Sequence, residues 1–288
     1  MTQVKVKYLN YSGEDLDGIN PVPKVLALGF FDGVHLGHQR VINTAKQIAK
    51  EKHLPLAVMT FNHHPCEIFK SANDLSMKYL SSLEEKIRLM GNLGVNILYV
   101  VNFDLKFANL AQNTFVDKYI VGLNAKHVVA GFDYTFGKFG AGNMGSLSSL
   151  SNNRFKVTTV DQLSSRKEKI SSTRIRKLIK LGKISQADKL LGHSYQIDGR
   201  IYQSVNGLFH FLVDNPKLQL PVGGNYIGRL ANDINVEVPV SINEAEQIFL
   251  DLPTSIVLNS FSQAVSIDLV RENLAISAVK PTLQSQVI

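Results

Sequence analysis

The stretch VLALGFFDGVHLGHQR, residues 25–40, decides the fold of the first part of the chain. It begins as a continuous apolar run, passes through a glycine-containing segment at residues 32–37, and continues into a segment with helical spacing. Continuous apolar runs are typical of strands that are covered on both faces of a parallel sheet. The stretch therefore predicts a first strand, a turn at its carboxyl end and the beginning of a helix at His38.

Similar apolar runs follow along the chain and alternate with helical patterns. We expect a first helix around residues 41–49, a second over 83–94 capped by Ser82, and a third over 112–123. Strands that alternate with helices predict right-handed crossovers and a doubly wound α/β fold, with ligands bound beyond the carboxyl ends of the strands. The four further predicted strands are residues 54–61, 96–103, 126–132 and 155–160.

The pattern changes in the last third of the chain. Two helices are predicted at residues 170–182 and 184–192, each ending on a glycine that suits a left-handed cap, Gly182 and Gly192. Short strands follow, which predicts a small antiparallel barrel or sandwich. We expect an α/β domain at 1–182, a linker helix at 183–193 and the β-domain at 194–288. The predicted strands of the β-domain are residues 197–205, 208–213, 225–230, 234–242, 254–261 and 264–270.

Length and composition are those of a soluble globular protein. The 288 residues are 44% hydrophobic and 19% charged, which fits one large domain or two ordinary ones. The apolar runs are too short to span a bilayer, and the start of the chain lacks the apolar stretch of a signal peptide. A single cysteine, Cys66, excludes an internal disulfide and a cysteine-based zinc cluster. We expect a cytoplasmic protein.

The chain is basic, with a net charge of +7 and a pI near 9.3. Such a charge favours anionic partners, which include nucleic acid, membrane surfaces and phosphorylated small molecules. No aromatic residues interleave with the densest basic segment, as a single-strand nucleic-acid surface would require. A solvated helix face is the alternative interpretation of this segment. Its basic residues are Arg166, Lys167, Lys169, Arg174, Arg176, Lys177 and Lys180.

His35 and His38 lie beside Gly33 and Gly37 at the predicted carboxyl end of the first strand. Four roles are open to the histidines: metal ligands, a catalytic base, core packing, and hydrogen-bond donors to a phosphate. Zinc requires at least a third ligand, and the HExxH pattern is absent. The positive N-terminus of a helix is a natural phosphate site, and glycines let a ligand approach the backbone. We therefore favour the phosphate role.

Residues 29–38, GFFDGVHLGH, resemble the HxGH signature of the nucleotidyltransferase superfamily. In their full form they resemble the FAD synthetase (FMN adenylyltransferase) module of bacterial bifunctional riboflavin kinase/FAD synthetases. TFNHHP at 60–65 is similar to the family's TFxPHP, with His63 in place of its first proline. GFDYTFGKFGAG at 131–142 is similar to GxDFxFG, and ISSTRIR at 170–176 to SSTxIR. Together the motifs cover roughly residues 20–190.

The resemblance implies a Rossmann-like nucleotidyltransferase domain that converts FMN and ATP into FAD and pyrophosphate. It implies catalytic roles for His35, His38 and Arg176 on the phosphates, with Mg²⁺ bridging phosphate oxygens and Asp133 as its one candidate protein ligand. Each of these features also has a structural alternative. Asp133 could stabilise a turn, and the Ser-Ser-Thr segment could simply cap a helix. The aromatic residues of segment 131–142 could belong to the core. The implied ATP-binding residues are Gly29, Phe30, Asp32, Gly33, Gly37, Ser171, Ser172, Thr173 and Arg174. The implied flavin or nucleotide loop residues are His64, Asp133, Tyr134 and Phe136.

The C-terminal part departs from the family pattern. Residues 207–212 read GLFHFL where the kinase module carries GFPTAN, whose Thr and Asn are associated with Mg²⁺ and ATP phosphates. PVGGNY at 221–226 still resembles the family. We expect a monofunctional FAD synthetase with an inactive riboflavin-kinase-like barrel, no stable nucleic-acid partner and no membrane partner. The alternatives are a bifunctional enzyme that also phosphorylates riboflavin, and a flavin- or RNA-binding regulator.

Overall fold

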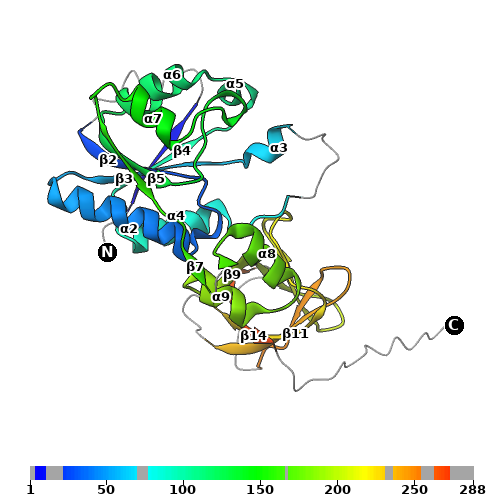
Figure 1. Ribbon diagram of the computed structural model, residues 1–288. Helices are drawn as coiled ribbons and strands as arrows, with labels where there is room; N and C mark the ends of the chain where they lie inside the picture. The colour runs from blue at the N-terminus through cyan, green and yellow to red at the C-terminus, as the bar shows by residue number, and fades with distance from the viewer. Residues whose placement is uncertain are drawn as a thin grey trace. The chain divides into compact units, whose positions relative to one another are not determined.

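The computed structural model describes residues 4–10, 22–69, 77–165, 168–230, 236–253 and 263–272. The chain forms two compact units, Met1–Ser172 and Thr173–Ile288. The first contains an open parallel sheet and the small two-stranded sheet of β7 (Ser164–Ser165) and β8 (Glu168–Lys169), and the second contains a closed barrel (Figure 1). The predicted domain limits at residues 182 and 194 stay a prediction.

The first unit is built on a six-stranded parallel sheet in the order β1-β4-β3-β2-β5-β6. All five predicted strands form. The sixth, β1, was not predicted because its sequence KVKYL mixes charged and apolar residues, and only Leu9 of this edge strand is buried. The strands are β1 (Lys5–Leu9), β2 (Lys24–Leu28), β3 (Leu56–Phe61), β4 (Ile97–Val101), β5 (Ala125–Gly131) and β6 (Lys156–Val160).

Helices cover both faces of this sheet (Figure 1). On β2, Val25 and Ala27 point into the core under α2 and α4, whereas Leu26 and Leu28 point into the core under α5, α6 and α7. This period of two explains why the whole strand is apolar. The helices are α2 (Leu36–Glu51), α3 (Pro65–Phe69), α4 (Leu83–Asn92), α5 (Leu105–Ala108), α6 (Gln112–Phe115), with its π-helical continuation η2 (Val116–Val121), and α7 (Met144–Leu150).

The predicted helices form, although α2 begins at Leu36, two residues before the predicted start at His38, because the His35 side chain caps it. The Ser82 hydroxyl caps α4 by accepting the backbone N–H of Glu85. The predicted helix over 112–123 forms as α6 and η2 in succession. Gly182 and Gly192 have φ values of 74° and 78° after α8 (Ser172–Lys180) and α9 (Ile184–Leu191), as predicted for left-handed caps.

The second unit contains a closed barrel in the order β10-β13-β12-β11-β14-β9, joined by antiparallel pairs. Of the barrel and the sandwich, the barrel is the one that forms. Alternate residues of β9 point inward, among them Tyr195, Ile197 and Ile201. β13 was not predicted, and the predicted strand at 254–261 lies outside the described residues. The barrel strands are β9 (Tyr195–Gln203), β10 (Phe209–Val213), β11 (Gly224–Leu230), β12 (Glu237–Ile242), β13 (Ile248–Leu250) and β14 (Gln263–Glu272).

The strand order locates the ligand edge of the parallel sheet. From β2 the chain builds outward through β3 and β4, and then returns to place β5 on the other side of β2. The order therefore reverses between β2 and β5. Open α/β sheets bind ligands beyond the carboxyl ends of the strands at such a reversal. The segments that follow Leu28 and Gly131 accordingly form the candidate site.

Candidate active site

The segment after β2 is a tight turn with an unusual backbone. Phe31 and Val34 have φ values of 56° and 39°, although neither is glycine, and Gly33 has a φ of 74°. Non-glycine residues in the left-handed region cost free energy and persist where the surrounding structure holds them. The turn ends at His35, the residue that precedes α2. It places both histidines at the N-terminus of a 16-residue helix.

His35 and His38 are in direct contact. The Nδ1 atom of His35 accepts the backbone N–H of His38 at 3.3 Å, which caps α2. The two imidazole rings stack with centroids 3.5 Å apart and planes 16° apart. Because the capping bond requires a lone pair on Nδ1, the neutral His35 ring carries its proton on Nε2. Nε2 is therefore the atom through which His35 can donate a hydrogen bond.

Burial lowers the pKa of His38 well below its usual value, and nearby His35, Lys86 and Lys169 lower it further. The Nδ1 atom of His38 is buried and has no hydrogen-bond partner among the residues that the structure describes. The Phe31 ring meets the His38 ring edge-on at 5.3 Å. His38 is thus a neutral imidazole at neutral pH.

Two glycines of the motif are required by close packing. A Cβ atom on Gly37 would lie 3.0 Å from Cε1 and 3.1 Å from Nδ1 of His35. A Cβ atom on Gly29 would lie 2.7 Å from the Phe31 ring. Gly37 is therefore needed for the position of the His35 ring, and Gly29 for that of the Phe31 ring.

Hydrogen bonds fix the turn to distant segments of the same unit. The Asp32 carboxylate accepts the backbone N–H of Leu80 at 2.9 Å, and the N–H of Gly33 donates to the Ser81 hydroxyl at 3.1 Å. The Ser172 hydroxyl donates to the Asp32 carbonyl at 3.1 Å. Asp32 is only 2% exposed. The bonds of Asp32 are thus made to the protein, and they hold the turn in place.

The segment after β3 also reaches this turn. The His64 ring lies edge-on to the Phe30 ring with centroids 4.8 Å apart. The Nδ1 atom of His64 accepts the backbone N–H of Cys66, and the N–H of His64 donates to the Tyr79 hydroxyl. His64 is therefore next to the β2 turn, whereas His63 is paired with Glu67 at 3.2 Å.

The segment after β5 carries an ion pair. The Asp133 carboxylate is paired with the Lys169 ammonium, which also lies 4.9 Å from the Phe132 ring centroid. Among the described residues, no three His, Cys, Asp or Glu side chains are grouped so that they could hold a metal ion. A magnesium ion in this site would consequently depend on phosphate oxygens for most of its ligands.

An aromatic pocket of about 410 Å³ opens at the same edge of the sheet. Its residues come from the end of β3, from α5 and α6, and from the segment after β5. The Tyr134 hydroxyl has its pKa raised by burial, so it stays protonated as a donor. Phe139 is 81% exposed although it lines the pocket. The principal aromatic residues of the pocket are Phe61, Phe103, Phe107, Tyr134, Phe136 and Phe139.

The Ser-Ser-Thr segment lies where the two units meet in sequence. Ser171 and Ser172 belong to the first unit, and Thr173, Arg174 and Arg176 belong to the second. Within the first unit, Ser172 contacts the β2 turn through its bond to Asp32. The roles of Thr173, Arg174 and Arg176, which belong to the second unit, stay predictions.

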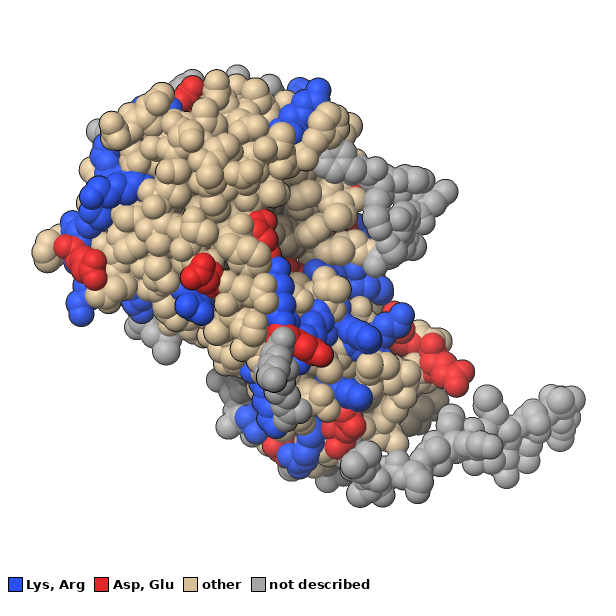
Figure 2. All heavy atoms as spheres, in the orientation of Figure 1, with Lys and Arg blue, Asp and Glu red and all other residues tan. Residues whose placement is uncertain are grey.

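The basic segment is largely a helix face. Within α8, Ile175 and Ile179 are buried while Lys177 and Lys180 are exposed. Lysine and arginine side chains gather over the region of α8 and α9 (Figure 2). Arg166 and Lys167 lie outside the described residues. A solvated helix face is therefore what the structure shows for Lys177 and Lys180.

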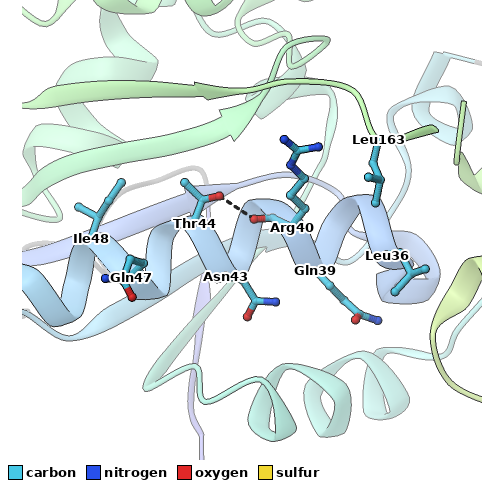
Figure 3. Close-up of a pocket in the computed structure, with 8 residues that line it drawn as sticks. All are labelled: Leu36, Gln39, Arg40, Asn43, Thr44, Gln47, Ile48 and Leu163. Atoms are coloured by element: carbon cyan, nitrogen blue, oxygen red, sulfur yellow. Dashed lines mark hydrogen bonds between the residues drawn. The ribbon is translucent and has the colours of Figure 1, made fainter. Parts of the chain in front are cut away.

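A second hollow, of about 630 Å³, runs along α2 and is lined by polar side chains such as Gln39, Asn43 and Gln47 (Figure 3). The Thr44 hydroxyl there donates to the Arg40 carbonyl at 2.9 Å. Leu163 also lines the hollow and lies beside the end of α2 that carries Leu36 (Figure 3). No titratable pair or cluster lines it, and it has no counterpart among the predicted site residues.

Sequence reasoning missed two residues beside the β2 turn. Tyr79 accepts the bond from His64, and Lys86 of α4 is a buried lysine whose pKa burial lowers to about 8. One signal for Lys86 was present. It lies three residues after Leu83 and four before Met90, on the apolar stripe of the predicted helix.

Comparison with known proteins identifies the family. Residues 19–174 match the family model for FAD synthetase, which is more than half of the chain. The chain belongs to the FAD synthetase family. This confirms the resemblance drawn from the four motifs, and the matched region contains both histidines, the aromatic pocket and Ser171 to Arg174.

Relatives of this FAD synthetase family member include bifunctional enzymes. The bifunctional riboflavin kinase/FMN adenylyltransferase of Listeria monocytogenes is 49% identical over 180 residues, 62% of this chain and 57% of that protein. The Bacillus subtilis protein of the same description is 48% identical over 61% of this chain and 55% of its own length. The chain thus spans little more than half the length of these relatives.

Two further proteins match over more of the chain. A Listeria monocytogenes FAD synthetase is 33% identical over 224 residues, 75% of this chain and 87% of that protein. A Streptococcus pneumoniae crystal structure described as a macrolide-efflux protein matches with a TM-score of 0.81 and 27% identity, over 94% of this chain and all of that one. The described part of the present chain has no helix with the length and apolar character needed to cross a membrane.

Proposed function

We propose that this protein is an FMN adenylyltransferase, which transfers AMP from ATP to the phosphate of FMN and yields FAD and pyrophosphate. The observation that carries the proposal is the stacked pair of His35 and His38 at the N-terminus of α2, at the sheet edge that also holds the aromatic pocket. Phosphates favour that helix end, and flat aromatic rings favour that pocket. FMN and ATP each carry both kinds of group.

The chemistry needs no strong base. The FMN phosphate is already an anion at neutral pH, so one of its oxygens attacks the α-phosphorus of ATP while the bond to the β-phosphate oxygen breaks. The task of the protein is to align the two substrates and to stabilise charge on the oxygens. In this proposal His35 donates through Nε2, His38 donates as a neutral imidazole, and the first N–H groups of α2 add the partial positive charge of the helix.

The ATP side of the site would be formed by the β2 turn and the Ser-Ser-Thr segment. Its residues would be Gly29, Phe30, Asp32, Gly33, Gly37, Ser171, Ser172, Thr173 and Arg174. The packing of the turn supports this assignment. Gly29 leaves room for the Phe31 ring, and Gly37 leaves room for the His35 ring. The hydrogen bonds of Asp32 and Gly33 hold the turn itself. Arg176 would bind the triphosphate through its guanidinium group. The support for Thr173, Arg174 and Arg176 is their match to the SSTxIR motif.

The isoalloxazine ring of FMN would enter the aromatic pocket. A volume of about 410 Å³ falls within the range of about 300–1,000 Å³ that is usual for small-molecule sites. Tyr134 supplies a hydroxyl, and Phe136 and Phe139 supply faces for stacking. His64 would lie between this pocket and the phosphate turn, since its ring contacts Phe30.

Mg²⁺ would enter with the phosphates of ATP and would neutralise charge on the departing pyrophosphate. The residues present fit an ion held mainly by substrate. Asp133 is the acidic side chain at this edge that could supply a ligand, and it is paired with Lys169 in this structure.

We further propose that the barrel has no riboflavin kinase activity. Residues 207–212 lack the Pro-Thr-Ala-Asn sequence, and β10 (Phe209–Val213) begins within this stretch. The relatives described as bifunctional match only about three-fifths of this chain, whereas the relative described as FAD synthetase alone matches three-quarters of it. The chemistry implies small-molecule partners and no nucleic acid. The single cysteine and the use of ATP support a cytoplasmic location.

One experiment tests both proposals. The purified protein is mixed with ATP and Mg²⁺ and either FMN or riboflavin, and the flavins are separated by chromatography. FAD formed from FMN, with riboflavin unchanged, is the expected result. Absence of FAD would overturn the adenylyltransferase proposal, and formation of FMN from riboflavin would overturn the proposal for the barrel. The His38→Gln variant is the control that assigns the activity to this chain.

A further inference from the structure

Lys86 of α4 is a buried charged residue whose ammonium lies at the carboxyl end of β2. None of the four motifs contains it. Its side chain is 4% exposed. The Nζ atom donates to the Phe30 carbonyl at 3.0 Å and to the Thr60 hydroxyl at 3.3 Å. The Thr60 hydroxyl donates to the same carbonyl at 2.7 Å, and the ammonium lies 4.3 Å from the Phe30 ring centroid. Lys86 therefore holds both the backbone and the ring of Phe30.

The position of Phe30 determines where the turn begins. Phe31 follows it with a φ of 56°, and the chain then passes through Gly33 to His35. A turn in this backbone region persists only where its ends are held. The hydrogen bonds of Leu80 and Ser81 hold its middle, and those of Lys86 and Thr60 hold its start.

The charge of Lys86 reaches the catalytic pair as well. The groups that act on the His38 imidazole are His35 of α2, Lys86 of α4 and Lys169 of β8 (Glu168–Lys169), and all of them lower its pKa. Asp32 partly offsets the burial of Lys86 by raising its pKa. With a pKa of about 8, Lys86 is mostly protonated at neutral pH. Its charge thus favours a neutral His38.

We propose that Lys86 is a positioning residue of the adenylyl-transfer site, which fixes the Phe30 carbonyl and so sets the turn that presents His35 and His38. This inference rests on the proposed function for its kinetic consequences, and on the bonds of Lys86 alone for its structural ones. A buried amide or apolar residue could fill the same volume, but neither would supply the charge.

A matched control exists in the same unit. Lys24, at the opposite end of β2, is 0% exposed, and its pKa is also lowered to about 8, mainly by burial. Its ammonium donates to the Leu123 carbonyl. Lys24→Met and Lys86→Met therefore both remove a buried ammonium that binds a backbone carbonyl. Lys24→Met removes a hydrogen bond at the amino end of β2, whereas Lys86→Met removes hydrogen bonds at its carboxyl end, where the histidine turn begins.

The test compares both variants with the wild type by thermal unfolding, by kinetics of FAD formation and by NMR titration of the histidine Cε1–H signals, with His38→Gln to assign His38. Misplacement of catalytic groups by about 1 Å can cost about 100-fold in rate, so we expect a kcat loss of about that size in Lys86→Met with KM values within about threefold. Lys24→Met should lower the melting temperature and leave kcat within about threefold of wild type.

The pH profile separates positioning from general destabilisation. Removal of the Lys86 charge should raise the pKa of His38, so the acid limb of kcat should move to higher pH in Lys86→Met and stay in place in Lys24→Met. Equal kcat losses in the two variants, or a folded Lys86→Met variant with wild-type kcat, would overturn the proposal.

Two further measurements keep the test decisive. Should Lys86→Met fail to fold, Lys86→Gln retains a donor for the Phe30 carbonyl without the charge. A kcat near wild type together with a raised His38 pKa in this variant would support positioning through the bond to Phe30, and a kcat loss of about 100-fold would overturn it. Should the wild type form no FAD, the proposed function fails, while the NMR titration still decides. A His38 pKa that is raised in Lys86→Met and unchanged in Lys24→Met supports the effect of Lys86 on the histidine site. A His38 pKa that is unchanged in Lys86→Met contradicts it.

Discussion

The Nδ1 atom of His35 accepts the backbone N–H of His38 at 3.3 Å, and the rings of the same two residues stack 3.5 Å apart. One imidazole therefore caps α2 and packs against the second imidazole. The cap fixes the proton of the neutral His35 ring on Nε2, and the stack places His38 beside it. In the proposed mechanism, helix capping and phosphate binding would thus be joined in a single side chain.

Substitution of His35 should separate these two tasks. Asparagine retains an oxygen that can cap α2, whereas alanine has no acceptor, and loss of a cap typically costs about 1 kcal/mol. We expect His35→Ala to lose both stability and turnover, and His35→Asn to lose turnover while its free energy of unfolding stays near that of wild type. Urea unfolding and the rate of FAD formation measure the two effects. Wild-type turnover in His35→Asn would show that the ring serves only as a cap.

Gly37→Ala tests the packing of the same ring. The new methyl group would lie 3.0 Å from the His35 ring, so we expect a fall in kcat of about tenfold or more from displacement of the ring. Gly91→Ala in α4 is the control, because its methyl group would meet only Val4 at 3.8 Å. That change should stabilise the helix by about 0.5–1 kcal/mol without an effect on kcat. Similar kcat values for both variants would contradict the role of Gly37.

Much of the fold could be predicted because its signals are local. The five buried strands are continuous apolar runs, and Ser82, Gly182 and Gly192 are local end signals that the structure confirms. β1 and β13 were missed for physical reasons. β1 buries only Leu9, and Ile248–Leu250 is too short for an alternating pattern to be recognised.

The candidate site shows a sharper division. His35, His38, Gly37 and His64 could be found because they lie in motifs near strand ends. Lys86 and Tyr79 could not be assigned to the site, because each reaches it from a segment distant in sequence. Lys86 is 56 residues from Phe30, and Tyr79 is 15 residues from His64. In the sequence LEEKIRL, Lys86 follows two other charged residues, Glu84 and Glu85. Three adjacent charges are typical of an exposed helix face, so this run of charges gives no indication that the Lys86 ammonium is buried.

The lowered pKa of His38 predicts a dependence of stability on pH. The unfolded chain binds a proton to this residue near pH 6.5, whereas the folded chain does so only at lower pH. His38 therefore contributes stability above pH 6.5 that is lost as the pH falls below that value, by at most about 1.4 kcal/mol per pH unit. Urea unfolding of wild type and His38→Gln between pH 8 and 5 should show a shallower decline in the variant. Parallel curves would contradict the burial of His38.

Phe139→Ala tests the proposed flavin pocket. Phe139 is 81% exposed, so its removal should change the melting temperature little. A lost aromatic stacking contact of about 1 kcal/mol predicts a rise of about fivefold in the KM for FMN, with the KM for ATP unchanged. Leu105→Ala removes another exposed apolar side chain of the same unit, 59% exposed and outside the pocket lining, and should leave both KM values at wild type. Equal changes in the two KM values would argue against a flavin contact.

Asp188 in the barrel unit offers the opposite pH behaviour. Burial and the nearby Asp268 raise its pKa to about 7, although its carboxylate accepts the backbone N–H of Tyr195 at 2.9 Å. A raised pKa means that the stability contributed by this group is present below about pH 4 and is lost as the pH rises through about 7. Asp188→Asn keeps the oxygen that accepts the Tyr195 bond and removes the titration. The variant should therefore melt about 3 °C above wild type at pH 8, with the difference shrinking toward pH 5. Asp214→Asn, which alters an exposed carboxylate 3.7 Å from Arg200, should show no such gain at either pH. A pH-independent difference for Asp188→Asn would mean that the carboxylate is not buried in its charged form.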